Sequence, residues 1–155
     1  MKRAAGTIAA VIVLAAGIAA YHWIGADEVA VAAGDPVNGE KLYAENCASC
    51  HGANLEGQPD WQKNNPDGTL PAPPHDDSGH TWHHPDSMLF SYTKIGGQAW
   101  LDANGITQFK SAMPAFEGVL TDQEISDVLA FIRSRWSERA RKTQAEITAE
   151  HQARN

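Results

Sequence analysis

The chain has 155 residues, with 12 Lys and Arg against 19 Asp and Glu, and a net charge of −7. This length suits one small domain with additional segments. Residues 35–132 hold fourteen of the acidic residues and four of the basic ones, a local charge of −10. So acidic a surface argues against a nucleic-acid partner, because such binding depends on basic side chains. The negative charge either attracts a partner protein that has a basic docking patch, or it only keeps the domain soluble.

The N-terminal segment is strongly apolar. Residues 1–3 include Lys2 and Arg3, and an almost uninterrupted apolar run follows over residues 4–24. A membrane-spanning helix needs about 20 residues, whereas the apolar centre of a cleaved secretory signal has roughly 7–15. The length and the positive start predict a single-pass inner-membrane anchor with a cytoplasmic N-terminus. Residues 25–34 would then tether a domain on the periplasmic side. Signal cleavage, leaving a soluble periplasmic protein, is the alternative.

The first predicted elements are helices separated by a long loop. Asp35-Pro36 places a capping side chain before a proline and predicts a helix to about Asn46. Residues 52–86 contain six prolines and are expected to be a loop that wraps something. Pro85-Asp86 should open a second helix that stops at Gly96-Gly97. Residues 98–119 are expected to be irregular, apart from a short turn near Phe109-Lys110.

The clearest predicted helix spans Thr121–Trp136. Thr121-x-x-Glu124 forms a capping box. The positions after it give one apolar stripe at helical spacing: Ile125, Val128, Leu129, Ile132 and Trp136. Residues 137–155 are mainly charged and polar, and are expected to extend the helix into solvent or to fray.

The only two cysteines lie in the motif Cys47-Ala48-Ser49-Cys50-His51. This C-x-x-C-H spacing marks covalent attachment of a c-type haem, with the histidine as an axial iron ligand. A disulfide or redox dithiol, and a zinc site completed by His80, His83 and His84, are the alternatives. The expected export and the helix before the motif favour one covalent haem c.

A second axial ligand would complete an electron-carrying haem. Met88, Met113 and the histidines are the candidates. Met88 falls within a predicted helix at an apolar position, where core packing is its expected role. Met113 precedes Pro114, which favours an extended, stiff presentation of the thioether. Met113 is therefore predicted to bind the iron opposite His51, the His/Met pair of cytochromes c.

These features resemble a class I, mono-haem cytochrome c over residues 35–136. The resemblance rests on Cys47–His51, Met113-Pro114 and the helix Thr121–Trp136. It implies an all-α fold of about three to five helices around one covalent haem, with the first and last helices crossing. Gly39 and Tyr43 would meet residues of the last helix: Leu129, Phe131 and Ile132. The membrane segment, the insert at residues 59–86 and the charged tail depart from small soluble members.

The insert is rich in histidine and aspartate. It contains His75, His80, His83, His84, Asp76, Asp77 and Asp86. Such a stretch invites weak copper binding, although the spacing matches no defined metal site. The insert could also place Trp82 or a histidine against the haem edge or its propionates, or simply be a polar cover with solvated histidines.

The resemblance implies a carrier of single electrons between membrane-bound respiratory complexes, and no catalytic residue is predicted. Two alternatives are a fixed haem subunit of a larger oxidoreductase complex, and a haem enzyme or sensor with an open iron position.

Overall fold

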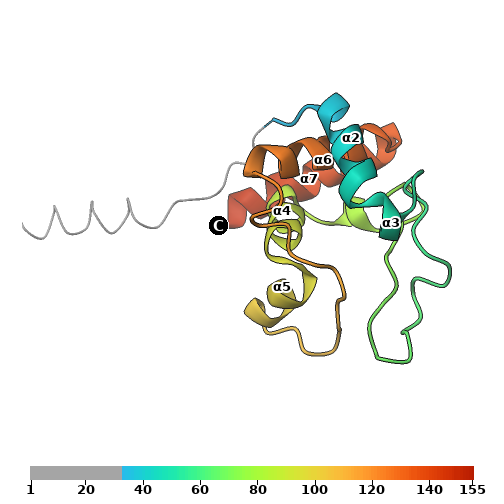
Figure 1. The fold of residues 1–155 in the computed structure, drawn as a ribbon. Helices are drawn as coiled ribbons and strands as arrows, with labels where there is room; N and C mark the ends of the chain where they lie inside the picture. Colours follow the sequence, from blue (N-terminus) through green and yellow to red (C-terminus); the bar gives the residue numbers. More distant parts are fainter. Residues whose placement is uncertain (1–32) are drawn as a thin grey trace, which may run out of the picture. The chain divides into compact units, whose positions relative to one another are not determined.

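A computed structural model describes residues 33–155 of the chain. Within this part every regular element is helical: α2 (Pro36–Asn46), α3 (Ala48–His51), η1 (Thr81–His83), α4 (Asp86–Ile95), α5 (Gly97–Ala103), α6 (Asp122–Ser134) and α7 (Glu138–Arg154) (Figure 1). The prediction of an all-α fold is therefore confirmed for the described residues, with more helices than the three to five expected. The predicted anchor at residues 4–24 and nearly all of the tether lie outside the described residues. Between residues 33 and 155, no helix is long and apolar enough to cross a bilayer.

Helices α2 and α6 cross at close range (Figure 1). Gly39 makes this possible, since a Cβ at that position would lie 1.9 Å from the carbonyl oxygen of Asp127 and 3.0 Å from Cβ of Phe131. One turn later the rings of Tyr43 and Phe131 are 5.4 Å apart. The predicted meeting of Gly39 and Tyr43 with the last helix of the domain is thus confirmed, with Phe131 as the residue opposite both.

The same crossing is fixed at the N-terminus of α2. The Asp35 side chain caps the helix by accepting from the Val37 amide. The Asp35 amide and the Asn38 side chain each donate to the Asp127 carboxylate, both at 2.8 Å. Burial opposes ionisation of Asp127, but hydrogen bonds from Asn38, Asp35 and Gln123 outweigh it, so the pKa of this carboxyl lies below its ordinary value.

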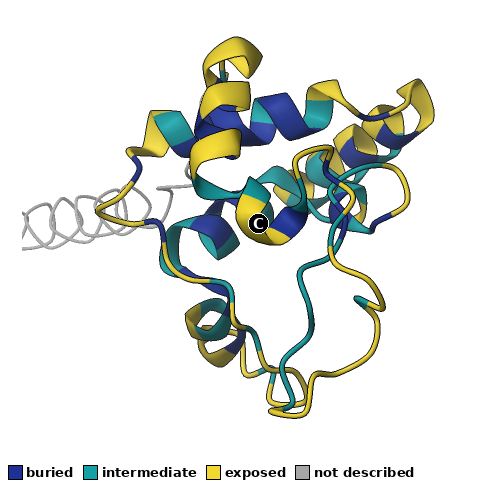
Figure 2. Cartoon of the chain, turned by 45° about the vertical axis from the view of Figure 1, so that its right-hand side comes forward, coloured by how far each residue is buried: buried dark blue, intermediate teal, exposed yellow. Residues whose placement is uncertain are grey.

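One hydrophobic core joins the helices, and the dark-blue faces of α2 and α6 point inward to it (Figure 2). Its most buried members include Tyr43, Leu55, Ile125, Val128, Ile132, Trp136 and Ala140. Helix α6 begins with the predicted capping box, in which Thr121 and Glu124 satisfy each other's backbone amides. It ends at Ser134, so Trp136 lies in the turn before α7.

The C-terminal segment differs from both alternatives expected for it. Residues 138–154 form a separate helix, α7, that packs against η1 and the base of the insert. Gln144 is 2 % exposed and donates to the Asp86 carboxylate at 2.6 Å, while Thr148 accepts from the Asp86 amide. The Ser137 amide donates to Asp77 at 3.0 Å. The buried residues of α7 are Ala140 and Gln144, one small and one polar. The sequence of this helix therefore has no apolar stripe from which its packing could be predicted.

The region between α4 and α6 also holds more structure than expected. Residues 97–103 form helix α5, so the prediction of irregular structure from residue 98 is wrong there. In place of the expected turn, Lys110 pairs with Thr69 in an isolated bridge between the α5–α6 segment and the tip of the insert. The segment from residue 52 to 80 is a loop, as predicted, and forms the long excursion on the right of Figure 1.

Candidate functional site

The Cys47–His51 motif occupies one turn of helix at the end of α2. Cys47 is the C-cap of α2 and the N-cap of α3, with its amide bonded to the Tyr43 carbonyl at 2.8 Å. The His51 amide donates to the Cys47 carbonyl at 3.0 Å, so both thiols and the imidazole arise from a single turn. The Tyr43 hydroxyl donates to the Gly52 carbonyl and holds the end of that turn against α2.

The two thiols of the motif differ in burial. Cys47 is half-buried, Cys50 is exposed, and neither takes part in a disulfide. Burial, together with the neighbouring Cys50, raises the pKa of the Cys47 thiol to about 11. Reactive dithiols need a lowered pKa, because the thiolate is the nucleophile. The Cys47 thiol therefore lacks the lowered pKa that a reactive dithiol requires.

His51 is oriented as a metal ligand would be. The residue is 7 % exposed, and its Nδ1 lies 2.9 Å from the carbonyl oxygen of Pro73. Burial lowers the pKa of His51, although the bond to Pro73 opposes that shift, so the ring is neutral at pH 7. A neutral ring that donates from Nδ1 keeps the lone pair of Nε2 for a metal. Nε2 has no hydrogen-bond partner among residues 33–155.

Met113 lies on a loop that is tied to the α4–α5 junction. The Ser111 hydroxyl accepts from Tyr92 at 3.0 Å and from the Met113 amide at 3.2 Å. The Gly97 amide donates to the Met113 carbonyl at 3.1 Å. A Cβ on Gly97 would come within 2.0 Å of Oγ of Ser111, so only glycine permits this approach. The sequence marked Gly96-Gly97 as a helix stop but gave no sign that it anchors the Met113 loop.

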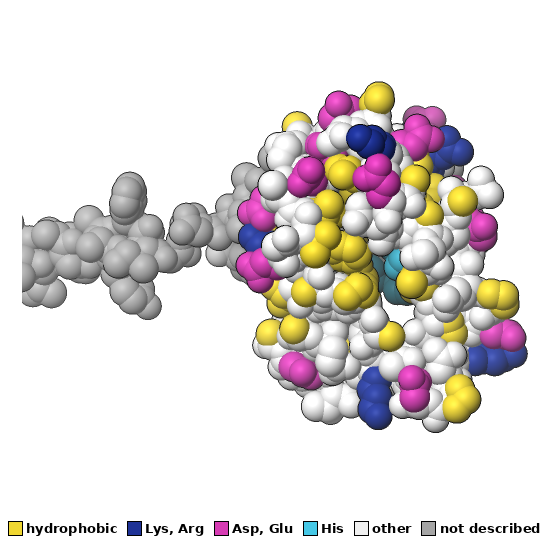
Figure 3. All heavy atoms as spheres, viewed as in Figure 1, with side chains coloured by type: hydrophobic (Ala, Val, Ile, Leu, Met, Phe, Trp, Pro, Cys, Tyr) yellow, Lys and Arg dark blue, Asp and Glu magenta, His cyan; other side chains and the backbone are white. Residues whose placement is uncertain are grey.

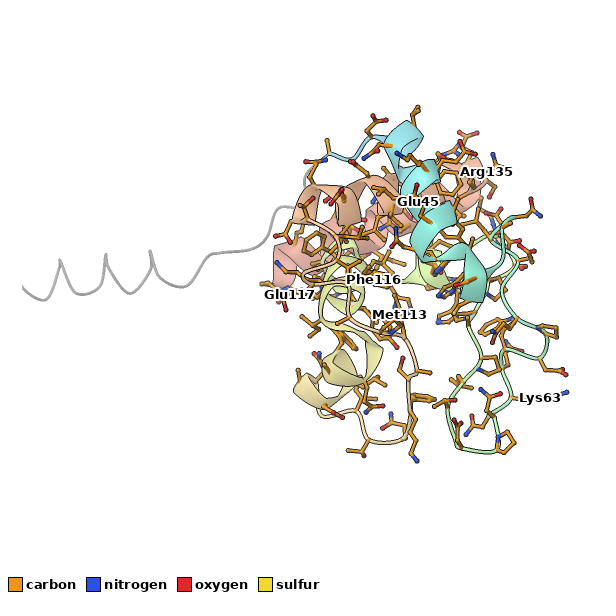
Figure 4. All side chains as sticks on the ribbon, viewed as in Figure 1. Glu45, Lys63, Met113, Phe116, Glu117 and Arg135 are labelled. Atoms are coloured by element: carbon orange, nitrogen blue, oxygen red, sulfur yellow. The ribbon has the colours of Figure 1, made fainter. Side chains whose placement is uncertain are left out.

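Cys47 and Met113 are both half-buried beside the hydrophobic core. Five partly buried side chains pack against the core cluster: Cys47, Ala48, Trp82, Leu89 and Met113. Figure 4 shows Met113 in the middle of the view, between its loop and α3. In the same view, Figure 3 shows a hollow with hydrophobic side chains along its walls and histidine on one side. Met88, the other methionine considered as a ligand, lies half-buried on α4.

The histidines of the insert do not gather into a metal site. In residues 33–155 there is no group of three or more His, Cys, Asp or Glu side chains that could hold a metal ion. Weak copper binding and the zinc alternative therefore lack a structural basis. His80 stacks on Trp61 at 5.2 Å between ring centroids, and His83 lies on Trp82 at 3.7 Å. Burial lowers the pKa of His84 to about 4, and the nearby His80 and His83 contribute to the same shift.

Among the described histidines of the insert, His75 is the one that stacks on His51 of the Cys47–His51 motif. Its ring lies 4.0 Å from that of His51, with 20° between the planes. Burial, and then the nearby His51 and His80, hold the pKa of His75 well below its ordinary value, so this ring is also neutral at pH 7. The sequence listed His75 among the residues of the insert, but nothing in its spacing singled it out.

The residues present fit the expected haem. Trp82 Nε1 and His80 Nδ1 are shut off from solvent without a hydrogen-bond partner among the described residues. Buried polar atoms are rarely left unpaired in folded proteins. Trp82, like Cys47 and Met113, is a partly buried side chain that packs against the hydrophobic core. An apolar ring system with acidic substituents suits half-buried apolar side chains such as Met113, and its acidic groups would supply an acceptor of the kind that Nε1 of Trp82 lacks.

Comparison with known proteins gives a consistent result. The family model described as "Cytochrome c" matches residues 36–136. A cytochrome c6 of Nostoc sp. is 32 % identical over 103 residues, covering 64 % of this chain and 70 % of the relative. A cytochrome c6 of Anabaena variabilis is 36 % identical over 100 residues, covering 63 % and 88 %. A third, from Porphyra purpurea, is 34 % identical over 114 residues, covering 72 % and 80 %. No solved structure gives a significant match.

Proposed function

The chain belongs to the cytochrome c family, and from this premise we propose that it is a carrier of single electrons whose haem iron is bound by His51 and Met113. The resemblance found in the sequence is confirmed by the family match over residues 36–136. Membership implies one covalently bound haem c and a function in haem-based electron transfer. The haem, when bound, supplies an iron that gains and loses one electron. The ligands, partners and location proposed below go beyond that membership.

Each residue of the motif has a separate role in this proposal. Cys47 and Cys50 would hold the porphyrin through thioether bonds, and Nε2 of His51 would bind its iron. The single observation that carries the proposal is the 2.9 Å contact from Nδ1 of His51 to the Pro73 carbonyl, which fixes the ring and leaves Nε2 for metal. A histidine ligand held by a carbonyl in this way is more basic and better oriented.

Met113 is proposed as the ligand on the opposite face. Its half-buried place beside the core, and the bonds that tie its loop to Ser111 and Gly97, support this role. An iron with both axial positions filled cannot bind a substrate without losing a ligand. Electron exchange through the haem edge is then the expected activity, in preference to an enzyme or sensor with an open position.

The attachment sites are tested with Cys47→Ala and Cys50→Ala. Each variant should retain less covalent haem than the unaltered protein, because one of the two thioether bonds is missing. Haem staining of a denaturing gel measures the loss. Ser49→Ala, in the same turn, is the matched control and should stain like the unaltered protein. Undiminished staining in both cysteine variants would overturn the assignment.

The second ligand is tested with Met113→Leu, with Met88→Leu as its control. The Met113 variant should keep its covalent haem, lose the far-red absorption of thioether-bound ferric haem, and show a lower reduction potential, because thioether ligation raises the potential. The Met88 variant should retain both properties. If Met88→Leu changed the spectrum and Met113→Leu did not, the ligand would be Met88.

The proposed location is the periplasmic face of the inner membrane, with residues 4–24 as the anchor. The apolar length of that run and the positive residues before it support this reading. A tether of this kind would raise the concentration of the haem domain near membrane-bound respiratory complexes. The mass of the mature protein discriminates between a retained anchor and a cleaved signal.

The proposed partners carry a basic docking patch, since residues 35–132 have a net charge of −10. On the face seen in Figure 3, Asp and Glu side chains outnumber Lys and Arg. Opposite charges accelerate encounter, and the rate falls as salt screens them. Electron transfer to such a partner should slow with increasing ionic strength. A stable stoichiometric complex in mild detergent would favour a fixed subunit instead of a mobile carrier.

A further inference from the structure

His75 and His51 form a parallel pair of rings at the centre of the site. The ring centroids are 4.0 Å apart and the planes differ by 20°. Two imidazole rings in this geometry are stacked face to face and in van der Waals contact. The bond from Nδ1 of His51 to Pro73 fixes one edge of the His51 ring, and His75 covers one face. Rotation about the Cβ–Cγ bond of His51 would therefore have to displace His75.

His75 is itself held by three segments that are remote from one another in the sequence. Its amide donates to the Leu55 carbonyl at 2.8 Å, and its carbonyl accepts from Nε1 of Trp136 at 2.7 Å. Its Nδ1 and Oγ1 of Thr81 are 2.8 Å apart, within hydrogen-bond distance. Thr81 is 5 % exposed and Trp136 is 3 % exposed, so these anchors are protected from water. The two backbone bonds fix the position of His75, and the bond at Nδ1 orients its ring.

We propose that His75 is a positioning residue that fixes the plane of the His51 imidazole and thereby sets the reduction potential of the haem. The inference rests on the proposed function, because it requires His51 to bind the iron. A carbonyl bond at Nδ1 raises the basicity of a histidine ligand, and a more basic ligand stabilises the oxidised iron. In this proposal His75 keeps the bond between Nδ1 of His51 and the Pro73 carbonyl short and in line. Removing the His75 ring should therefore weaken that bond and raise the reduction potential.

The test uses the full-length holoprotein with His75→Leu, which keeps an apolar side chain of similar size but removes the flat ring. Its reduction potential should rise. At a fixed applied potential, the ratio of oxidised to reduced haem should fall threefold to tenfold, and a tenfold change corresponds to 59 mV for one electron. The haem-methyl shifts in the proton NMR spectrum of the ferric protein, which follow the orientation of the ligand plane, should change as well.

Two further variants keep the test decisive if His75→Leu fails to fold. Thr81→Val removes only the hydroxyl that faces Nδ1 of His75, and should move the potential and the methyl shifts in the same direction by less. His83→Leu removes an exposed histidine from the same insert, whose ring lies on Trp82, and should leave both readouts unchanged.

The proposal is overturned if folded His75→Leu and Thr81→Val proteins keep the potential and methyl shifts of the unaltered protein. It is also overturned if His83→Leu shifts both readouts as far as His75→Leu, because the effect would then belong to the insert as a whole. Failure of the proposed function has a different signature. In that case the unaltered protein would itself lack covalent haem, or would keep its axial histidine after His51→Ala.

Discussion

The α2–α6 crossing and the contact between the insert and α7 both join distant parts of the chain, but different interactions hold them together. At the crossing, apolar side chains pack over a glycine, with Gly39 lying against the backbone of Asp127. At the second contact, polar groups meet, with Gln144 and Arg133 both bound to the Asp86 carboxylate at 2.6 Å. The first contact holds the Cys47–His51 turn, whereas the second holds the residues that cover His51. The crossing should therefore govern whether the domain folds, and the polar contact should govern how firmly the insert is held.

The largest expected effect is that of Gly39→Val. The new Cβ would lie 1.9 Å from the Asp127 carbonyl oxygen, so the helices must separate. We expect the free energy of unfolding to fall by about 3 kcal/mol or more. Urea denaturation of the holoprotein measures the loss, and Val37→Ala, at a position 77 % exposed on the same helix, is the control. A change below about 1 kcal/mol would show that the crossing is not the determinant of folding.

A smaller and more local effect is expected from Gln144→Ala. The substitution removes a buried donor from the Asp86 carboxylate and should cost about 2 kcal/mol, as for hydrogen bonds to charged groups. Hydrogen exchange should accelerate at the amides of residues 75–86 and stay unchanged in α2. Glu150→Ala, exposed on the same helix, is the control. Equal acceleration in α2 would mean that the two contacts form one cooperative unit.

The crossing should also be sensitive to acid through Asp127. Its pKa is lower in the folded than in the unfolded protein, so the carboxylate stabilises the fold above the ordinary carboxyl pKa, and this contribution is lost as the pH falls through the folded value. We expect a loss of about 1 kcal/mol below roughly pH 4. In Asp127→Asn this part of the pH dependence should be absent. An unchanged acid profile in that variant would assign the sensitivity to other carboxylates.

The smallest effect is expected at the tip of the insert. Lys63 and Asp60 form an ion pair at 2.8 Å, but their side chains are 77 % and 69 % exposed. Exposed pairs contribute little, so Lys63→Ala should change the free energy of unfolding by less than about 0.5 kcal/mol. A larger loss, measured by the same urea titration, would show that the tip contributes to stability beyond its contacts with Lys110 and the stacking of Trp61 on His80.

The crossing could be predicted because the sequence resembles the cytochrome c family, whose first and last helices cross, whereas apolar periodicity and the capping box predicted α6 itself. The sequence also placed Cys47–His51 at a helix end and Met113 on a stiff loop. It could not reveal the contact with α7, since Gln144, Ala140 and Thr148 give no apolar stripe. The Ser111 network and the His51–His75 stack were equally hidden, because they depend on which loops meet in space. The ligand roles of His51 and Met113 remain predictions.

The separation of the two crossing helices has a consequence for the order of events during synthesis. Asp35 and Asp127, which are bound to each other in the folded protein, lie 92 positions apart. The turn with both cysteines is complete at residue 51, whereas α6 does not begin until residue 122. At about 5–20 residues per second, roughly 4–14 s pass between the two. During that interval α2 lacks the helix against which it packs, so the turn with both cysteines is complete before the crossing can hold it in place.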